Sequence, residues 1–308
     1  MSDIGHWYDR NTLELITQVP MATPTYKGVC VCGETWKLTK TKAKGTVLCP
    51  ICGEQAEVEE KLFRDATVTD ARKVGALCSV TTMIDEVKGK GMVLEKWIRD
   101  QLICAAIDFP YTGDPENEEE RKVHARMLIA KANEKRDVTA ERGTELHGMV
   151  YEFFTNNIRP ADLVGAGICD RIAQQLEREG IDEVECEKVI GSAELGWAGA
   201  TDLAGLRKGE VKLVDDLKTT SLKTFSGAYD KWKIQLGGYS IGLGDTPKLV
   251  SVVADRDGNC WGKDDYVRFI EHDEPEIWKG VFNNVLEIWV KTCCKGGYDP
   301  RKFTEEAV

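Results

Sequence analysis

Long apolar runs are missing from this sequence, and their absence excludes a membrane-spanning helix. No segment approaches the roughly 18 consecutive apolar residues that such a helix requires. The segment from Met1 to His6 also lacks the charged and apolar regions of a secretory signal peptide. We therefore expect a cytoplasmic protein without a membrane partner.

Positive charge is also scarce. Lysine and arginine number 41 against 52 aspartates and glutamates, which leaves a formal net charge of −11. This balance excludes nucleic-acid binding through the whole surface, so any such binding would need a local basic path. Apolar material is sufficient for a core, because 42% of the residues are hydrophobic and eight are tryptophan. The 308 residues predict one large α/β domain with a small appendage.

Eleven cysteines without a secretory signal indicate thiols and metal ligands in a reducing cytoplasm. Four of them form two close pairs, Cys30 with Cys32 and Cys49 with Cys52. The second pair, in Cys-Pro-x-Cys-Gly, has the form of a zinc knuckle, whose turn lets two thiolates converge. The pairs together resemble a zinc ribbon with one structural Zn²⁺, although the first spacer has one residue where two are usual. Free or redox-active thiols are the alternative, and no βαβ pattern supports it.

The expected ribbon occupies residues 23–60, after an extended or loosely helical lead at 1–22 and before the main domain at 61–308. Two segments between the cysteine pairs, Thr35–Leu38 and Thr46–Leu48, suit a short hairpin. Its lysines would either bind nucleic-acid phosphates or line a solvated loop, and the sequence favours neither (Lys37, Lys40, Lys42 and Lys44).

An Asp-x-Lys pattern follows the apolar run Val211 to Val214. Alternation along a strand places Asp216 and Lys218 on one face, while Leu217 points into the core. Asp202 is expected on a neighbouring strand of a three-strand antiparallel meander over residues 184–217. Two carboxylates and a lysine suit a hard divalent cation and a polarised water. Taken alone, the pattern is more typical of a surface strand with a solvated salt bridge than of a metal site.

Two helices flank this pattern. The segment Arg142 to His147 lies in one helix, whose apolar face begins at Leu146. Thr139 is a reasonable N-cap for this helix, after a separate basic helix at 121–137. A later helix at 224–242 carries Gln235 and Tyr239 four residues apart on one face. A C-terminal helix at 274–294 is expected to turn five apolar residues inward (Ile277, Val281, Val285, Ile288 and Trp289).

The order of these motifs resembles the PD-(D/E)XK nuclease superfamily, and within it the RecB-like and phage-type exonuclease branch. The motifs are Gly-x-x-x-His, Gly-x-x-Asp, Asp-x-Lys-Thr and Gln-x-x-x-Tyr, spread over about 100 residues. The resemblance implies a restriction-endonuclease-like core: a central mixed sheet flanked by helices. Some relatives bind an iron–sulfur cluster through one upstream and three spaced C-terminal cysteines. That spacing is absent here, so no cluster is expected.

The resemblance also implies residue roles. Asp202, Asp216 and the Leu217 carbonyl would bind Mg²⁺ or Mn²⁺, with His147 at the same metal. Lys218 would orient the attacking water, and Gln235 and Tyr239 would support the lysine and the DNA backbone. The catalytic set is therefore Asp202, Asp216, Lys218, Gln235 and Tyr239. Basic residues near the site would line the DNA path (Arg142, Lys223, Lys231 and Lys233).

The expected activity is a metal-dependent DNA exonuclease acting on linear ends or single strands, in phage recombination or DNA processing. Such a protein would work in the cytoplasm of a bacterial host if a phage encodes it, beside a recombination partner protein. A structure-specific or nicking endonuclease is one alternative. A DNA-end-binding scaffold with a silent nuclease site is another, and the presence of every catalytic residue argues against it.

Overall fold

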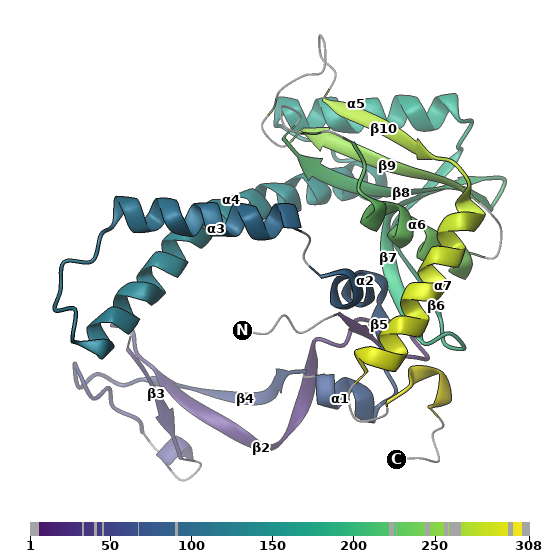
Figure 1. The fold of residues 1–308 in the computed structure, drawn as a ribbon. Helices are drawn as coiled ribbons and strands as arrows, with labels where there is room; N and C mark the ends of the chain where they lie inside the picture. The colour runs from purple at the N-terminus through teal and green to yellow at the C-terminus, as the bar shows by residue number, and fades with distance from the viewer. Residues whose placement is uncertain are drawn as a thin grey trace.

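The computed structural model describes residues 6–32, 34–39, 42–44, 46–66, 68–89, 92–221, 225, 227–243, 247–255, 258, 266–294 and 298–303. These residues confirm the expected mixed α/β fold, with a central mixed sheet flanked by helices (Figure 1). A smaller sheet near the N-terminus adjoins the four cysteines of the predicted ribbon. Across this described part of the chain, no helix combines the length and apolar character needed to span a membrane.

The central sheet has the strand order β1-β5-β7-β8-β9-β10, and β6 pairs with β7. Strands β6, β7 and β8 form the predicted antiparallel meander. Strand β8 then runs parallel to β9, which requires a crossover, and helix α6 supplies it. The strands are β1 (Trp7–Tyr8), β5 (Leu77–Ser79), β6 (Glu183–Ser192), β7 (Trp197–Arg207), β8 (Glu210–Thr220), β9 (Lys248–Asp255) and β10 (Val267–His272).

Helices cover both faces of this sheet because successive residues of its strands point to opposite sides. Val214 packs with α2 (Val80–Lys88), α6 (Asp230–Gly242) and α7 (Pro275–Thr292). Its neighbour Leu213 packs with α4 (Glu118–Asn156) and α5 (Leu163–Arg178). Two shorter helical segments, α1 (Val68–Lys73) and η3 (Pro300–Lys302), complete the main body.

Part of the prediction for α7 is wrong. Ile277 and Ile288 are 53% and 47% exposed, although both were expected to face inward. The buried stripe instead follows positions i, i+3, i+4 and i+7 and begins at Phe282 (Phe282, Val285, Leu286 and Trp289). The helix is therefore rotated about its axis relative to the predicted orientation.

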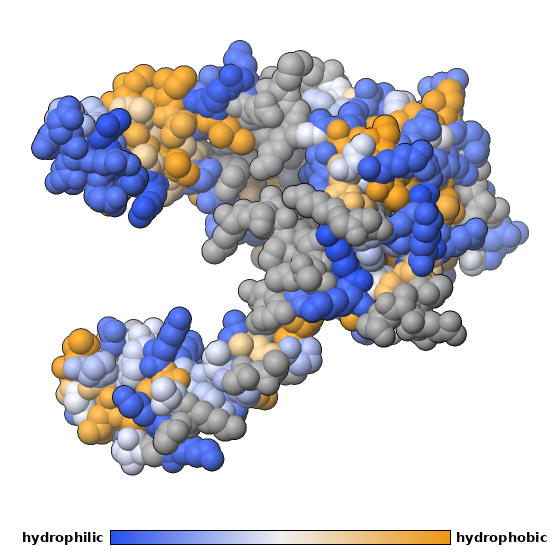
Figure 2. All heavy atoms as spheres, turned by 60° about the horizontal axis from the view of Figure 1, so that its bottom comes forward, coloured by the Kyte–Doolittle hydropathy of each residue, from blue (hydrophilic) through white to orange (hydrophobic). Residues whose placement is uncertain are grey.

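Helices α3 (Met92–Asp108) and α4 form an arm that extends away from the central sheet (Figure 1). The predicted break between residues 137 and 139 is wrong, because α4 is one helix of 39 residues in which Thr139 is internal. Neither proline nor glycine interrupts residues 118–142, so nothing in this stretch ends the helix. The N-cap is Asn117, whose side chain accepts the Glu120 N–H. Apolar side chains gather on the arm in Figure 2. Ile103 of α3 is 58% exposed.

The smaller sheet has the order β3-β2-β4 and differs from the predicted hairpin. Strand β3 (Thr35–Leu38) pairs with β2 (Gln18–Val29), whereas Leu48 contributes a single bridge to Gln55. The third strand is β4 (Glu57–Asp65), and a short 3-10 helix, η1, spans Lys42–Lys44.

The expected segment boundaries at residues 22 and 60 fall inside β2 and β4. The segment expected to be a lead contributes Trp7 and Tyr8 to the central sheet, where they pair with β5. Both sheets therefore draw on the first 22 residues.

Candidate functional site

The candidate site lies where β8 separates from β7. Strand β6 occupies one edge of β7 along its length, so β5 and β8 share the other edge, and β8 pairs there from Leu203 onwards. At the junction, side chains of β7 form hydrogen bonds with backbone groups of β8, where a regular ladder would pair backbone with backbone. Thr201 Oγ1 donates to the Asp215 carbonyl at 2.7 Å, and Asp202 Oδ2 accepts the Leu217 N–H at 2.6 Å. These bonds satisfy backbone groups that would otherwise lack partners, and they fix Asp202 at the junction.

The strand register places Asp202 beside Asp216. Leu203 pairs with Asp215, so the next residue on each strand, Asp202 and Asp216, are cross-strand neighbours on one face. Asp216 is 3% exposed and forms an ion pair with Lys218. Asp215 is also buried, and its pKa lies well above the usual value because burial disfavours its charge. By alternation Asp215 points to the opposite face of the sheet.

Helix α6 adds two polar side chains to this face. Gln235 Oε1 accepts from Lys218 Nζ at 3.2 Å, and Gln235 Nε2 donates to Asp216 Oδ1 and to Tyr239 Oη, each at 3.0 Å. Tyr239 packs against β7 at Gly199, where a Cβ atom would lie 2.7 Å from the Tyr239 ring. The glycine of the Gly-x-x-Asp motif therefore leaves room for the tyrosine of the Gln-x-x-x-Tyr motif.

Helix α4 brings His147 to the same junction. Its Nδ1 lies 3.1 Å from Asp202 Oδ1. The helix approaches β8 closely at Gly143, where a Cβ atom would lie 2.8 Å from Thr219 Oγ1. His147 follows about one turn later, so the glycine of Gly-x-x-x-His permits the close packing that places the histidine.

The two aspartates differ in their electrostatics. Burial raises the pKa of Asp216 to about 6, although the charge of Lys218 acts in the opposite direction. Burial also acts to raise the pKa of Asp202, but the hydrogen bond and charge of His147 outweigh it and bring that pKa below its usual value. The pKa of His147 is raised, because its interactions with Asp202 outweigh the effect of burial. At neutral pH both carboxylates are therefore mainly anionic.

Glu187 also joins this site, although it belongs to none of the four sequence motifs. One ligand atom each from His147, Glu187 and Asp202 lie within 4.8 Å of one another, which makes them a group that could hold a metal ion. Glu187 lies on β6 opposite Asp202, between the ladder pairs formed by Cys186 and Lys188. The turn at residues 193–196, which ends at Gly196 with a φ of 79°, sets this register. That turn is the sequence signal from which Glu187 could have been found.

The basic residues predicted to line a DNA path already have protein partners. Arg142 pairs with Glu145 at 3.0 Å and with Asp162 at 2.9 Å. On α6, Lys231 pairs with Asp85, and Lys233 pairs with Asp230 at 3.4 Å and lies over the ring of Trp278. Lys223 lies outside the described residues. Any DNA phosphate would therefore have to compete with acidic side chains for the three described cations.

The four ribbon cysteines converge. Their sulfur atoms all lie within 4.8 Å of one another, with 3.4 Å between Cys30 and Cys52 and 3.6 Å between Cys32 and Cys49. Tetrahedral zinc with Zn–S bonds of about 2.3 Å places its sulfurs about 3.8 Å apart, so the group fits zinc. Burial acts to raise the pKa of Cys49, but N–H groups of Cys52 and Ile51 outweigh it and lower that pKa to about 7. The turn thus favours the thiolate form of Cys49, whereas the N–H of Cys32, which acts to lower the pKa of Cys30, is outweighed by burial and by hydrogen bonds with the other thiols, and that pKa rises to about 12.

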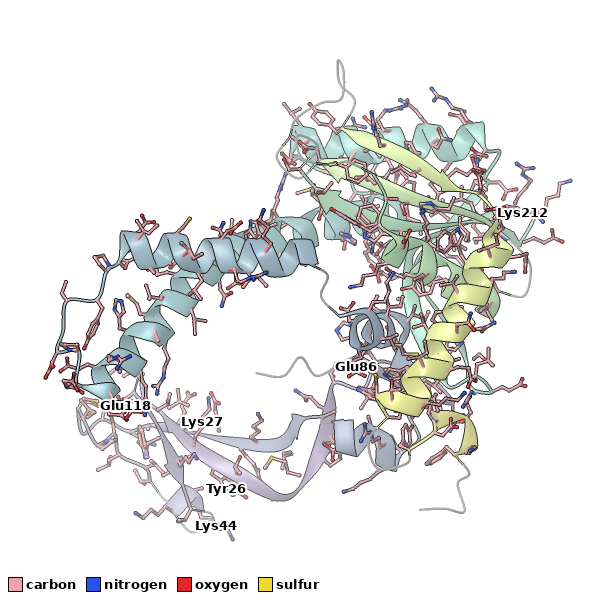
Figure 3. All side chains as sticks on the ribbon, in the orientation of Figure 1. Tyr26, Lys27, Lys44, Glu86, Glu118 and Lys212 are labelled. Atoms are coloured by element: carbon pink, nitrogen blue, oxygen red, sulfur yellow. The ribbon has the colours of Figure 1, made fainter. Side chains whose placement is uncertain are left out.

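The ribbon surface places acidic groups beside some of its basic ones. Figure 3 shows Lys27 and Tyr26 on β2, where Lys27 pairs with Glu59 at 2.8 Å and Tyr26 donates to Glu60. Lys44 lies on η1 and is exposed, whereas Lys40 lies outside the described residues. The described ribbon therefore presents acidic and basic groups together.

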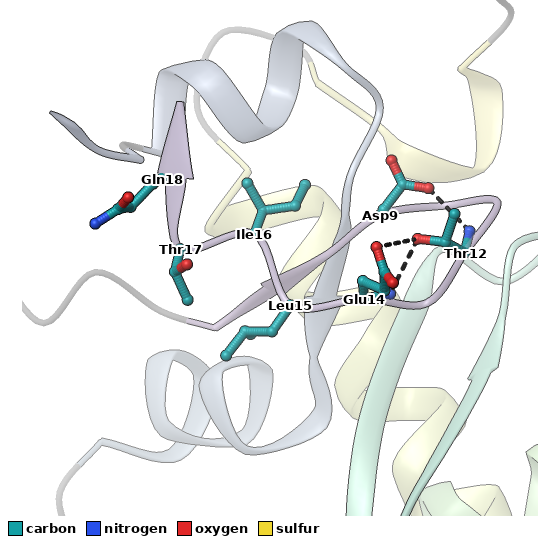
Figure 4. A pocket seen from close by; sticks show the side chains of 7 residues that line it. All are labelled: Asp9, Thr12, Glu14, Leu15, Ile16, Thr17 and Gln18. Carbon is teal, nitrogen blue, oxygen red and sulfur yellow. Dashed lines mark hydrogen bonds between the residues drawn. The ribbon is translucent and has the colours of Figure 1, made fainter. Parts of the chain in front are cut away.

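An open pocket of about 410 Å³ follows β1 (Figure 4). None of the predicted site residues lines it. Asp9 accepts the N–H groups of Asn11 and Thr12, which is the bonding of an ordinary turn. The lining residues are Asp9, Thr12, Glu14, Leu15, Ile16, Thr17 and Gln18.

No family model and no curated protein matches this chain. Among solved structures, a protein named SSO0001 is 14% identical, with a TM-score of 0.28, over 66% of this chain and 87% of its own. A protein named as a candidate exonuclease, from Eubacterium rectale, is 11% identical, with a TM-score of 0.30, over 49% of this chain and 64% of its own. Likeness at this level carries no conclusion about family or activity, so the site rests on its own geometry.

Proposed function

We propose that this protein is a metal-dependent nuclease of the PD-(D/E)XK type that hydrolyses DNA from its ends. One observation carries the proposal: four motifs dispersed over the chain meet at the β7–β8 junction. Asp216, Lys218 and Gln235 form one hydrogen-bonded group, and Asp202 beside them contacts His147. A salt bridge on a solvated strand, the simplest alternative, would leave Asp216 exposed, whereas it is 3% exposed.

Each residue has a distinct task in the proposed reaction. Asp202 and Asp216 would hold Mg²⁺ or Mn²⁺ with the Leu217 carbonyl, because carboxylate and carbonyl oxygens suit these ions. When bound, the cation supplies a polarised water and neutralises charge on the phosphate. Lys218 would place its ammonium group beside the attacked phosphate and stabilise the charge that develops there. Gln235 holds Lys218 and Asp216 in register, and Tyr239 anchors Gln235.

The choice of an exonuclease follows from family resemblance, and a structure-specific or nicking endonuclease would use the same site. Linear and covalently closed circular DNA separate the two. We expect end-labelled linear DNA to be degraded in Mg²⁺ or Mn²⁺ while intact circles persist. Rapid cutting of closed circles would instead favour the endonuclease, and no cutting of either DNA would favour a binding scaffold.

Lys218→Ala tests the assignment of the site. Loss of a positioned charge should lower the rate of nucleotide release by roughly 10²–10⁴, while metal binding measured by calorimetry stays largely intact. Lys212→Ala is the matched control, because Lys212 lies on the same strand, is exposed and pairs with Glu210 (Figure 3). Wild-type activity in Lys218→Ala, or activity that survives exhaustive chelation, would place the active site elsewhere.

A further inference from the structure

Glu187 has a backbone conformation that its strand does not require. Its φ is 49°, in the left-handed region, although it lies in the middle of β6. The ladder between β6 and β7 pairs Cys186 with Leu203 and Lys188 with Thr201, and it omits Glu187 and Asp202. Such a conformation is strained in a residue other than glycine and persists only where the surroundings impose it.

The charges around Glu187 are unbalanced. Glu187, Asp202 and Asp216 occupy one cross-strand row over β6, β7 and β8, and neighbouring like charges on a sheet repel each other. Lys218 is committed to Asp216 and Gln235. In the described residues, the side chain of Glu187 makes no ion pair with lysine or arginine.

His147 lies beside Glu187 and Asp202 in this row. Its ring, the Glu187 carboxylate and the Asp202 carboxylate each place one ligand atom within a group 4.8 Å across. Asp202 directs Oδ1 towards His147 and Oδ2 towards the Leu217 N–H. Asp216 is not a member of this group, and its Oδ1 is already bonded to Gln235. The β6 side of Asp202 therefore offers three ligands without using Asp216.

We infer that His147, Glu187 and Asp202 form a divalent-cation position of their own, separate from the position between Asp202 and Asp216. One imidazole and two carboxylates suit Mn²⁺, since carboxylate oxygens bind this ion readily and it accepts an imidazole nitrogen more readily than Mg²⁺ does. The inference rests on the proposed function only in that both positions share Asp202. The left-handed backbone at Glu187 is the conformation that holds the third ligand.

Direct Mn²⁺ binding, measured by electron paramagnetic resonance, tests this assignment without reference to catalysis. Glu187→Gln should weaken Mn²⁺ binding at this position about tenfold or more, because it removes a charged ligand. Glu183→Gln is the matched control on the same strand, since Glu183 is exposed and lies outside the group. Asp216→Asn should retain this Mn²⁺ ion, and Asp202→Asn should lose it.

A second variant uses the backbone. Glu187→Gly removes the ligand and also relieves the left-handed strain, so its melting temperature without metal should equal or exceed that of the wild type. Mn²⁺ binding should still be weakened. Loss of folding in Glu187→Gln therefore leaves Glu187→Gly to decide the question.

The Mn²⁺ measurements and the DNA-cutting assay test the inference and the nuclease proposal separately. Unchanged Mn²⁺ affinity in both Glu187 variants, no Mn²⁺ binding by the wild type, or loss of all binding in Asp216→Asn would overturn the inference. A wild type that binds Mn²⁺ through Glu187 but cuts no DNA would leave the inference standing and overturn the nuclease proposal. A protein that cuts DNA but whose Mn²⁺ affinity is unchanged in both Glu187 variants would overturn the inference and leave the nuclease proposal standing.

Discussion

The two sheets of this protein are held together by different means. The central sheet lies between two clusters of fully buried apolar side chains, one with α6 and α7 and the other with α4 and α5. In the smaller sheet the described cluster has four buried members, and two of them are Cys30 and Cys49. A sheet with so little apolar burial needs a covalent or metal link to hold its shape. From this contrast we expect the central sheet to fold by packing of apolar side chains and the small sheet to depend on metal ligation.

Removal of zinc should unfold the small sheet and leave the central sheet folded, which is the largest difference that we expect between them. Zinc bound by four thiolates contributes on the order of 10 kcal/mol to the folding of small domains. We expect about one zinc per chain in protein purified without chelator, and its loss in Cys49→Ser with Cys52→Ser. Limited proteolysis should then cut within residues 23–60 while the central domain stays intact. Cys104→Ser is the control, because Cys104 is an exposed thiol outside the ribbon. A zinc-free wild type, or a ribbon equally protected in the double variant, would contradict the prediction.

Truncation of one apolar side chain in each sheet tests how far packing stabilises that sheet. Phe282 is fully buried and packs edge-on against Trp197, with ring centroids 5.4 Å apart. Phe282→Ala should lower the free energy of unfolding by about 3–5 kcal/mol. Val58→Ala in the small sheet should cost less than about 1 kcal/mol while zinc is bound, because Val58 is only partly buried. Urea titrations with zinc present measure both values, and equal losses would show that packing holds the two sheets alike.

Acid should lower the stability of the central sheet through His272, and we expect this effect to be smaller. Burial, reinforced by the charge of Lys233 and opposed by Asp273, lowers the pKa of His272 to about 4. His272 is 6% exposed and is bonded to Ser251 at 2.8 Å. The unfolded histidine takes up its proton near pH 6.5, so the central sheet should lose stability as the pH falls from about 6.5 to 4, by about 3 kcal/mol.

The variant His272→Gln isolates this loss from the acid release of zinc, which affects the small sheet in both proteins. Its free energy of unfolding should depend less steeply on pH over that interval than that of the wild type. Above pH 7 the difference between the two should be constant. Parallel curves throughout would mean that His272 does not contribute.

Much of this architecture could be predicted from sequence because its signals are local. The meander follows from apolar runs separated by short turns, and the cysteine pairs follow from their spacing. The convergence of Asp202, Asp216, Lys218 and Gln235 could be anticipated only through the order of the motifs. Periodicity alone places none of these residues relative to a distant element.

Other features depend on tertiary context. Thr139 resembles an N-cap, but a helix continues through such a residue when nothing nearby breaks it. The apolar residues of α7 outnumber those that the sheet can cover, so Ile277 and Ile288 remain exposed. Glu187 reads as one more surface acid in a charged strand, because its role depends on register and on a left-handed backbone.

The unbroken length of α4 has a mechanical consequence. Leu146 and Val150 are 1% and 3% exposed, so the end of the helix that carries His147 is fixed in the core, whereas Glu118 lies roughly 38 Å from Gly143 along the helix axis. Movement of the outer end therefore bends the helix between residues 118 and 142 and leaves the imidazole in place. We expect spin labels near Glu118 to report a broad range of distances to the central sheet, and labels near Gly143 a narrow one.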